Sequence, residues 1–516
     1  MSIPSIFNDV LGPVMRGPSS SHSAAALRIG RLVRDLMDGD IEHVLVEYDP
    51  NGSLVTTHKS QGTDMGLVGG LLGWEPTDER LMDYESHIEA SGIDIEVRYV
   101  SYGATHANTY KLTLSNAQEE HQVIALSTGG GMIEVIEIDG AEVLMAGDYY
   151  ELLIYVDDQE VMNHGDFPGG ASWHAGTQAF AKVRATQSFE PSLFERLLAI
   201  PGVRAVKCLH PVLPVPGTDR DMPFTNVAQM LAYNEQQLDL WELGMAYEAA
   251  RSGYDAERLK RLMLDLIQIW KHAIERGIEG TSYHDRILPA EAPGFDQAKR
   301  QGGLLDSPLN NEIILSVSAM MDVKSSMGII VAAPTAGSCG TLPGTVIGAA
   351  KVLKASDDDM VKALFAAGLI GVFITGGATF AAEEAGCMAE TGAAGSMAAA
   401  ALVTMAKGNL DQALGAASFA LQNSFGLICD PIGNRVEAPC MGKNVAAASN
   451  ALSCANMALS NYTQLLPFDE VIESMNQVGK AMPREHCCTG LGGLAATPTA
   501  RKIEGELENR HVKVSC

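Results

Sequence analysis

The sequence predicts a multidomain α+β protein, and three observations lead to that fold class. The 516 residues are enough for about three domains. Residues 1–145 alternate short strand-like runs with helical ones, and a second stretch of mixed character follows at 146–217. From residue 226 the composition changes to Ala, Met, Leu and Gly in helical spacing, which predicts a large all-α domain over 226–516.

The first domain, residues 1–145, is expected to be of the α/β type. Residues 23–37 and 65–72 are predicted to form helices. The strand-like runs are rich in Val, Ile and Tyr and alternate apolar with polar residues, as half-buried strands do; they fall at 43–49, 93–102, 108–116, 121–129 and 132–140.

The second domain, residues 146–217, is expected to be small and of mixed type. Two strand-like runs lie within 141–158. Residues 188–213 predict a helix, a turn and a strand. A linker rich in Pro and Gly follows at 214–223 and separates this domain from the helical region.

Helices dominate the third domain, and no strand is expected in it. Residues 363–382 carry no charge over 20 residues, which is long enough to span a membrane. This segment lacks an aromatic belt and a basic flank and runs into Glu383 and Glu384, so we interpret it as a buried core helix. The predicted helices cover 226–251, 255–276, 308–328, 342–355, 358–382, 393–407, 410–424, 443–461 and 468–480.

The net charge of the chain is strongly negative, which limits the kinds of partner that it is expected to bind. The 36 basic and 63 acidic residues give a formal net charge of −27. Such a surface repels phosphate backbones and anionic lipids, so neither nucleic acid nor a membrane is an expected partner. The first residues show neither the basic region nor the apolar run of a signal peptide, which favours a cytoplasmic protein.

Cysteines gather in the third domain. Six of the nine lie between residues 387 and 488. Nine cysteines are too few for a disulfide framework in a chain of this length. Cys387, Cys429 and Cys440 each have a Gly or Pro within two residues. Three thiolates from loops suit a cubane iron–sulfur cluster with one iron lacking a protein thiolate, but the absence of a C-x-x-C run also fits buried structural cysteines.

The remaining cysteines are assigned less readily. Cys487 and Cys488 are rival ligands, of which one at most would bind a compact cluster. We interpret the other internal cysteines as buried small residues: Cys208, Cys339 and Cys454.

Two loops rich in hydroxyl groups are candidate anion sites. In PTAGSCG (334–340), Thr335 and Ser338 offer hydroxyls and the glycines allow unusual backbone angles, although an ordinary turn has the same composition. In GPSSSHS (17–23), the serines read as caps of the helix that follows, with an anion at the helix N-terminus as the alternative. His22 among these hydroxyls is either a general base or a structural histidine.

A pyridoxal-phosphate enzyme is not expected. STGGGM (127–132) imitates a glycine-rich phosphate loop, but the nearest preceding lysine, Lys111, lies in a predicted strand without the context of a Schiff-base lysine. A Walker loop is absent from the sequence.

Taken together, the motifs resemble the iron–sulfur-dependent L-serine dehydratases (L-serine ammonia-lyases), in the single-chain form with fused beta-type and alpha-type regions. The resemblance extends over nearly the whole chain, and the motifs stand in the order of the family. They are GPSSSHS (17–23), GSLVTTHKSQGTD (52–64), HANT (106–109), STGGGMIEV (127–135), KSSMGIIVAAPTAGSCGTLPG (324–344), GLICDPIGNRVEAPCMGKN (426–444) and CCTGLGGLAATPTAR (487–501).

The resemblance implies a domain organisation and a cofactor. Residues 1–145 would be a substrate-binding-type domain, 146–217 an ACT-like regulatory domain, and 226–516 the catalytic domain. A [4Fe–4S] cluster would be held by Cys387, Cys429 and Cys440, and the terminal Cys516 is a candidate for the fourth iron when substrate is absent. The family also implies a homodimer.

The activity implied is the elimination of water from L-serine to give pyruvate and ammonia, with an open iron acting as a Lewis acid on the hydroxyl. The partner is then a small amino-acid substrate. The candidate catalytic residues are His22, Ser21, Thr335 and Ser338. The candidate substrate-binding residues are Ser19, Ser20, Thr63, Asp64, His106, Asn108, Thr335, Ala336 and Gly337.

One position departs from the family pattern. Gln61 stands where family members usually carry a histidine, and glutamine cannot take a proton near neutral pH. Either that histidine is not the base, or His58 or another group replaces it, or the substrate is another β-hydroxy amino acid such as threonine. Lys59 and Lys324 are alternative bases, although solvated lysines are the usual case. A catalytically silent amino-acid or iron–sulfur sensor is the rival from a different class.

Overall fold

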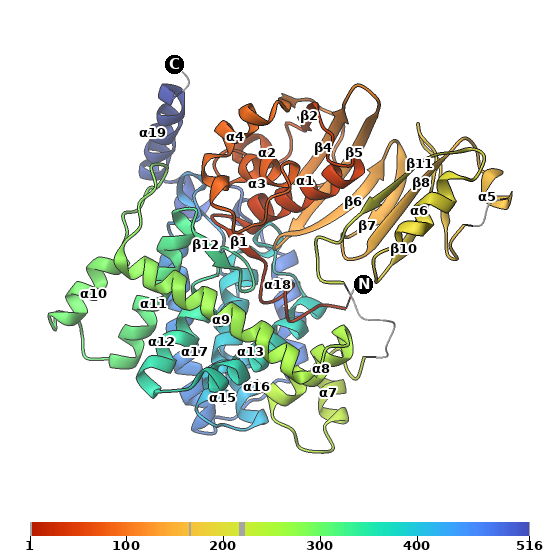
Figure 1. Ribbon diagram of the computed structural model, residues 1–516. Helices are drawn as coiled ribbons and strands as arrows, with labels where there is room; N and C mark the ends of the chain where they lie inside the picture. The colour runs from red at the N-terminus through yellow and green to blue at the C-terminus, as the bar shows by residue number, and fades with distance from the viewer. Residues whose placement is uncertain (1–2, 165–166, 216–221, 515–516) are drawn as a thin grey trace. The chain divides into compact units, whose positions relative to one another are not determined.

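The computed structural model describes residues 3–164, 167–215 and 222–514 and forms two compact units. One unit is Ser21–Thr218, and the other joins Met1–Ser20 to Asp219–Cys516. In Figure 1 the first unit runs from red to yellow and the helices of the second from green to blue. The fold is mixed α+β with a helical C-terminal region, as the sequence predicts.

A six-stranded sheet forms the first half of Ser21–Thr218. Its strand order is β3-β2-β4-β5-β6-β7; β2 and β3 are parallel, and every other pair is antiparallel. Alternation decides which side chains face the core, as in β4, where Tyr110, Leu112 and Leu114 are buried. The strands are β2 His43–Tyr48, β3 Asp94–Tyr99, β4 Thr109–Ser115, β5 Glu120–Gly129, β6 Met132–Ile138 and β7 Ala141–Met145.

The helices of this half pack together beside the sheet. α1 and α3 contact each other, and α1 also contacts β5 and β6. α1 begins directly after a π-helical turn, η1 (Ser20–Ala24), that contains the serine and histidine motif. The helices are α1 Ala25–Leu36, α2 Leu54–Thr57, α3 Thr63–Leu71 and α4 Tyr84–Ser91.

A four-stranded antiparallel sheet, in the order β11-β8-β10-β9, forms the second half. Its elements follow a β-α-β-β-α-β sequence, which is the ferredoxin-like arrangement. The helix and strand predicted over 188–213 are confirmed as α6 and β11. The elements are β8 Tyr150–Val156, α5 Val161–His164, β9 Ser172–His174, β10 Phe180–Ala185, α6 Pro191–Leu198 and β11 Val203–Leu209.

The helical unit is built around α15 (Ala393–Met405). This helix contacts α12, α13, α16 and α17 and is buried almost throughout. Its alanines and glycine allow that close approach on every side. The other helices are α7 Val227–Tyr233, α8 Leu240–Ser252, α9 Ala256–Glu279, α10 Ala292–Arg300, α11 Pro308–Ser325, α12 Thr341–Leu353, α13 Asp357–Gly377, α14 Ala382–Cys387, α16 Leu410–Gln422, α17 Cys440–Leu459, α18 Phe468–Lys480 and α19 Pro498–Val514.

Among the described residues, α13 is the helix that is long and apolar enough to cross a membrane. Most of its apolar window is buried inside the protein, which is typical of a core helix. It ends at Gly377, earlier than the predicted 382, and a new helix begins at Ala382.

The sequence missed several breaks and elements in this unit. The predicted helix 226–251 is two helices, because Glu242 accepts a hydrogen bond from the backbone N–H of Asp239 and starts α8 there. α10 and α19 were not expected. The expectation of no strand was wrong, since β12 (Ile329–Val331) pairs antiparallel with β1 (Val14–Arg16).

The amino-terminal segment is held on α8 by a buried carboxylate. Glu248 accepts hydrogen bonds from the Ser5 hydroxyl at 2.9 Å and from the Ile6 backbone N–H at 2.7 Å. Tyr247 donates to the carbonyl of Pro4 at 2.8 Å. Burial raises the pKa of Glu248 to about 7, although Arg251 and these donors oppose the shift.

We expect stability to depend on pH through Glu248. Because its folded-state pKa is raised above the ordinary 4.5 to about 7, the stabilisation is complete below pH 4.5 and is lost as the pH rises through 7. The shift corresponds to roughly 3 kcal/mol. The thermal midpoint of the Glu248→Gln variant should therefore fall less between pH 5 and 8 than that of the unsubstituted protein. Glu275→Gln, at an exposed site on α9, should keep the original dependence; equal slopes in all three proteins would contradict the assignment.

Candidate active site

Three motifs of the helical unit bring cysteines to one place. Cys387 ends α14, and Gly386 before it has a φ of +65°, a value that glycine adopts readily. A π-helical turn, η3 (Met388–Gly392), follows; such turns often mark functional sites. Cys429 lies in the loop between α16 and α17, and Cys440 is the first residue of α17.

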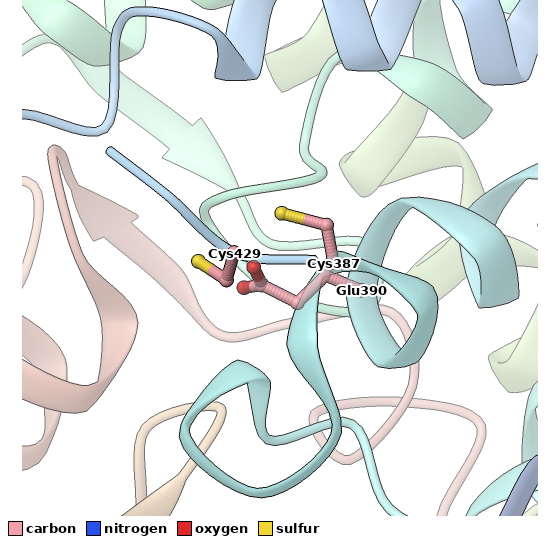
Figure 2. A group of neighbouring side chains, drawn as sticks. All are labelled: Cys387, Glu390 and Cys429. Atoms are coloured by element: carbon pink, nitrogen blue, oxygen red, sulfur yellow. The ribbon is translucent and has the colours of Figure 1, made fainter. Parts of the chain in front are cut away.

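Cys387 and Cys429 form a compact donor group with Glu390. Their ligand atoms all lie within 4.8 Å of one another, and Figure 2 shows the Glu390 carboxylate beside Cys429. Hydrogen bonding with the thiols of Cys387 and Cys488 and then burial raise the pKa of the Cys429 thiol well above its ordinary value.

Cys440 is buried near this group but is not one of its three members. Burial, and then the neighbouring Cys387, raise the pKa of its thiol. Cys516, the predicted tail ligand, lies outside the described residues.

Lys443 brings a positive charge to the thiols. Its Nζ lies 3.8 Å from the Sγ of Cys387 and donates to the carbonyl of Ile428 at 2.6 Å and to the carboxylate of Asp430 at 2.5 Å. Burial opposes the charge, but Cys387 and Asp430 outweigh it and the pKa of Lys443 is raised. An ammonium group held there stabilises negative charge on the cysteine sulfurs.

The predicted loop PTAGSCG (334–340), which we name the hydroxyl loop, contacts the carboxylate of Glu390. The Thr335 hydroxyl donates to Oε1 of Glu390 at 2.6 Å, and the Ser338 hydroxyl donates to the carbonyl of Ala333 at 3.2 Å. Thr335 Oγ1 also accepts from the Ser338 N–H at 3.3 Å. These hydrogen bonds give the Thr335 and Ser338 hydroxyls defined partners within the site.

Asn444 ties this loop to the cysteine helix. Its Nδ2 donates to the carbonyl of Gly337 at 2.8 Å and to that of Cys440 at 2.9 Å. Its Oδ1 accepts from the Thr341 hydroxyl at 2.8 Å. One fully buried amide thus fixes the distance between the hydroxyl loop and a candidate metal ligand.

Glu390 has room because residue 337 has no side chain. A Cβ at Gly337 would lie 2.7 Å from Oε1 of Glu390 and 3.0 Å from Oε2. Burial raises the pKa of Glu390 to about 7, and the hydrogen bond from Thr335 opposes the shift.

The serines of GPSSSHS lie at the start of the helical segment that leads into α1. They lead into η1, and the residue before α1, Ala24, makes no side-chain cap. Within the helical unit, the Ser20 hydroxyl accepts from the N–H of Ala336 at 3.4 Å. Within the other unit, the carbonyl of Ser21 accepts from the Ser127 hydroxyl at 2.7 Å.

His22 is buried and neutral. Thr57 gives its hydroxyl proton to the carbonyl of Ser53 at 2.7 Å, so Thr57 Oγ1 accepts from the Nε2–H of His22 at 2.9 Å. Burial, and then the nearby His58, lower the pKa of His22 to about 3. A histidine with this pKa is a weak proton acceptor near neutral pH.

His58 is held by partners on both ring nitrogens. Its Nδ1 lies 2.7 Å from Asp64, and its Nε2 lies 2.9 Å from the Tyr99 hydroxyl. A carboxylate only accepts, so the Nδ1–H of His58 donates to Asp64 and the Tyr99 hydroxyl donates to Nε2. Gln61 is buried in the same segment, and Thr63 begins α3 beside Asp64. The dyad of His58 and Asp64 is the ionisable pair nearest in sequence to Gln61.

The asparagine of the HANT motif, Asn108, is hydrogen bonded to Ser53 and to His106. Asn108 Oδ1 accepts a hydrogen bond from the Ser53 hydroxyl, and the N–H of Asn108 donates to His106 Nδ1 at 3.1 Å. Asn108 is buried and His106 is partly exposed.

The exposure of individual lysines and cysteines confirms some of the interpretations made from the sequence and changes others. Lys324, taken as a solvated lysine, is fully buried and donates to the carbonyl of Val436, whereas Lys59 is exposed as expected. Lys111 pairs with Glu47 at 2.9 Å. Cys339 and Cys454 are buried as predicted, but Cys208 is partly exposed.

Glu390, Lys443 and Asn444 were missed as functional candidates. Glu390 follows Cys387 by three residues, and Lys443 and Asn444 follow Cys440 within one helical turn. At i+3 and i+4 on a helix, side chains share a face. That spacing is the signal that could have found them.

The residues present fit an iron–sulfur cluster. Cysteine thiolates are the usual ligands of such clusters; Cys387 and Cys429 are buried side by side, and Cys440 is buried close enough to Cys387 to feel its charge. Several neighbouring thiolates repel one another in a buried site, so a bound cationic metal is the partner that their ionised forms require.

Comparisons with known proteins agree with this site. The family model of the serine dehydratase alpha chain matches residues 235–495, which include the hydroxyl loop and the ligand cysteines. The probable L-serine dehydratase alpha chain of Bacillus subtilis is 35% identical over 285 residues, covering 55% of this chain and 95% of the relative. The probable beta chain of the same organism is 41% identical over 159 residues, covering 31% of this chain and 71% of the relative.

L-serine dehydratase 1 of Escherichia coli is 26% identical over 494 residues, covering 93% of this chain and 96% of the relative. The helical fold, the thiol site and these matches define a lyase. The chain belongs to the iron–sulfur L-serine dehydratase family, in the form that fuses beta-type and alpha-type regions in one polypeptide.

Proposed function

We propose that the protein is a [4Fe–4S]-dependent L-serine ammonia-lyase that converts L-serine to pyruvate and ammonia. The observation that carries the proposal is the donor group of Cys387, Glu390 and Cys429 within the part of the chain that matches the serine dehydratase alpha chain. Cys387, Cys429 and Cys440 would hold the cluster. When bound, the cluster supplies a Lewis-acidic iron that weakens the C–O bond of the substrate.

The hydroxyl loop has the groups to orient a substrate carboxylate. Thr335, Ala336, Gly337 and Ser338 combine backbone N–H groups with hydroxyls, and Asn444 fixes the loop through the carbonyl of Gly337. Glu390 holds the Thr335 hydroxyl in one direction. Such positioning converts a collision into a unimolecular step.

Residues of the GPSSSHS motif (17–23) and others farther along the chain are proposed to make further substrate contacts. Ser20 touches Ala336 of the hydroxyl loop, and Ser21 and His22 follow it directly in the chain. The other proposed contacts rest on the family resemblance: Ser19, Thr63, Asp64, His106 and Asn108. At a pKa of about 3, His22 suits a neutral hydrogen-bonding role better than removal of the Cα proton.

Replacing His22 by Asn is expected to lower kcat about 10- to 100-fold through lost positioning, with unchanged iron content. Since the pKa of His22 is about 3, it stays neutral above about pH 5, so the variant should keep the shape of the pH–rate profile. His272→Asn, on the exposed face of α9, should retain the full rate. Loss of a titration near pH 6 in the His22 variant would show that His22 is the base after all.

Regulation and assembly are also proposed. The β-α-β-β-α-β sheet of β8 to β11 supports an ACT-like regulatory domain. The enzyme would act in the cytoplasm as a homodimer.

The proposal is tested by anaerobic purification and assay with a panel of hydroxy amino acids. We expect a brown protein that releases pyruvate from L-serine faster than 2-oxobutyrate from L-threonine. Gln61, in place of the family histidine, is the feature that favours another β-hydroxy amino acid, and preference for threonine would identify that substrate. A coloured protein without turnover on any member of the panel would indicate a sensor and overturn the proposal.

A further inference from the structure

Lys324 is a fully buried lysine in the last turn of α11. Its ammonium group has three N–H donors. One of them donates to the carbonyl of Val436, and in the part of the chain that the structure describes no second acceptor and no carboxylate lies within bonding distance of Nζ. Lysines are almost never fully buried without a partner for their charge. This ammonium group therefore needs a counterion that the described residues do not supply.

The charge of Lys324 acts on the hydroxyl loop and on the candidate metal site. Burial raises the pKa of the Cys339 thiol, which lies in the hydroxyl loop, and Lys324 opposes that shift. Burial and then Cys387 raise the pKa of Cys440, and Lys324 again opposes the rise. Burial also raises the pKa of Glu390, against the hydrogen bond from the hydroxyl loop and the charge of Lys324. The ammonium group is therefore close to all three groups.

The GPSSSHS motif packs against the backbone of Lys324 within the helical unit. A Cβ at Gly17 would overlap the carbonyl of Lys324, so this close approach requires glycine. The N–H of Gly17 donates to the carbonyl of Gly328 at 3.2 Å. Three residues after Gly17, the Ser20 hydroxyl accepts from the N–H of Ala336. Lys324 is thus in contact with one of the motifs that are proposed to bind substrate and near the other.

The two lysines near the donor group differ in their partners. Lys443 pairs with Asp430 at 2.5 Å, so its charge is already balanced by a carboxylate. The α-carboxylate of an amino acid brings a negative charge to a region that already contains Glu390 and the thiols. An anion that leaves water for such a region needs a cation beside it. Of the two lysines, Lys324 is the one without a carboxylate partner.

We propose that Lys324 binds the α-carboxylate of the amino-acid substrate, an inference that rests on the proposed function. The two N–H donors that Val436 does not use bind the carboxylate oxygens, and the N–H groups of the hydroxyl loop complete the site. Charge-assisted hydrogen bonds of this kind are short and strong. The contact selects substrates with a free α-carboxylate over the corresponding amides and amines.

The test uses anaerobically reconstituted protein and measures kcat and KM for L-serine. It also measures the inhibition constants of 3-hydroxypropionate and 3-hydroxypropionamide, which keep the hydroxyl group of L-serine and differ in charge. In Lys324→Met we expect KM and the inhibition constant of 3-hydroxypropionate to rise about 10- to 100-fold, as the loss of a hydrogen bond between charged groups predicts. The inhibition constant of the amide and kcat should change less than about threefold. Lys351→Met, at an exposed position on α12, should match the unsubstituted protein.

A second variant and two further measurements separate binding from a structural role. Lys324→Gln keeps a donor for the carbonyl of Val436 and should show the same rise in KM. Both variants should retain their iron and, without substrate, a thermal midpoint no lower than that of the unsubstituted protein, because a buried charge without a counterion is lost. Loss of iron would show that Lys324 balances the charge of the thiolates instead. A fall in kcat at unchanged KM would place Lys324 at the reacting atoms. Either result would overturn the proposal.

The two proposals fail in different ways. An unsubstituted chain that takes up no iron and releases no pyruvate contradicts the proposed function, and this inference with it. An active, loaded chain in which Lys324→Met weakens the acid and the amide equally contradicts this inference alone.

Discussion

Replacing Cys387 or Cys429 by serine is expected to remove both the iron and the activity. Their sulfurs belong to one donor group with Glu390, and both are buried. Serine hydroxyls do not ionise at neutral pH and bind iron poorly, so the cluster should not assemble. Loss of a residue that only supports the metal ligands lowers metal affinity or activity about 10- to 100-fold, so loss of a ligand itself should leave less than about 1% of the rate.

The measurement is turnover of L-serine beside absorbance near 400 nm and bound iron. Cys454→Ser is the matched control, because Cys454 is also buried and its partners, Asn423 and Asn450, can hydrogen bond to a hydroxyl equally well. This variant should keep its colour and rate. A colourless Cys387→Ser or Cys429→Ser protein with full activity would contradict the assignment.

Replacing Gly337 by alanine is expected to lower kcat about 100-fold, an effect typical of misplacing an active-site group by about 1 Å. The new methyl group would lie 2.7 Å from Oε1 of Glu390, so the carboxylate must turn away from Thr335. The carboxylate is the flexible end of its side chain, so the fold should tolerate the movement. The variant should therefore lose rate while retaining its thermal midpoint and most of its iron.

Gly294→Ala is the control for this substitution. Gly294 lies exposed on α10, and a Cβ there meets nothing within 4 Å. This variant should keep the full rate, and its midpoint should rise slightly because alanine favours the helix. An active Gly337→Ala protein would show that the contact between Glu390 and Thr335 is not needed for catalysis.

The local pattern of the sequence predicted most of the secondary structure. The alternation of β2 and β4 to β6 and the helical spacing of α9, α11 to α13 and α15 to α18 come from side chains that must face the core of their own unit. The short strands β1 and β12 were missed because their pairing joins residues far apart in the chain. For the same reason, the position of residues 3–20 in the helical unit does not follow from their composition.

The candidate site was predictable as a set of motifs but not as a geometry. The surroundings of Cys429 correctly identified it as a loop residue, whereas Cys387 and Cys440, expected in loops, lie at helix ends. The burial of Lys324 and the pKa of His22 depend on neighbours that only the folded chain supplies.

The most direct test of the central claim is the iron and acid-labile sulfide content of the anaerobically purified chain, measured together with its rate on L-serine. We expect about four irons and about four sulfides per chain, and a rate that falls in proportion as a chelator removes them. An iron-free chain that still releases pyruvate from L-serine at the full rate would contradict this account.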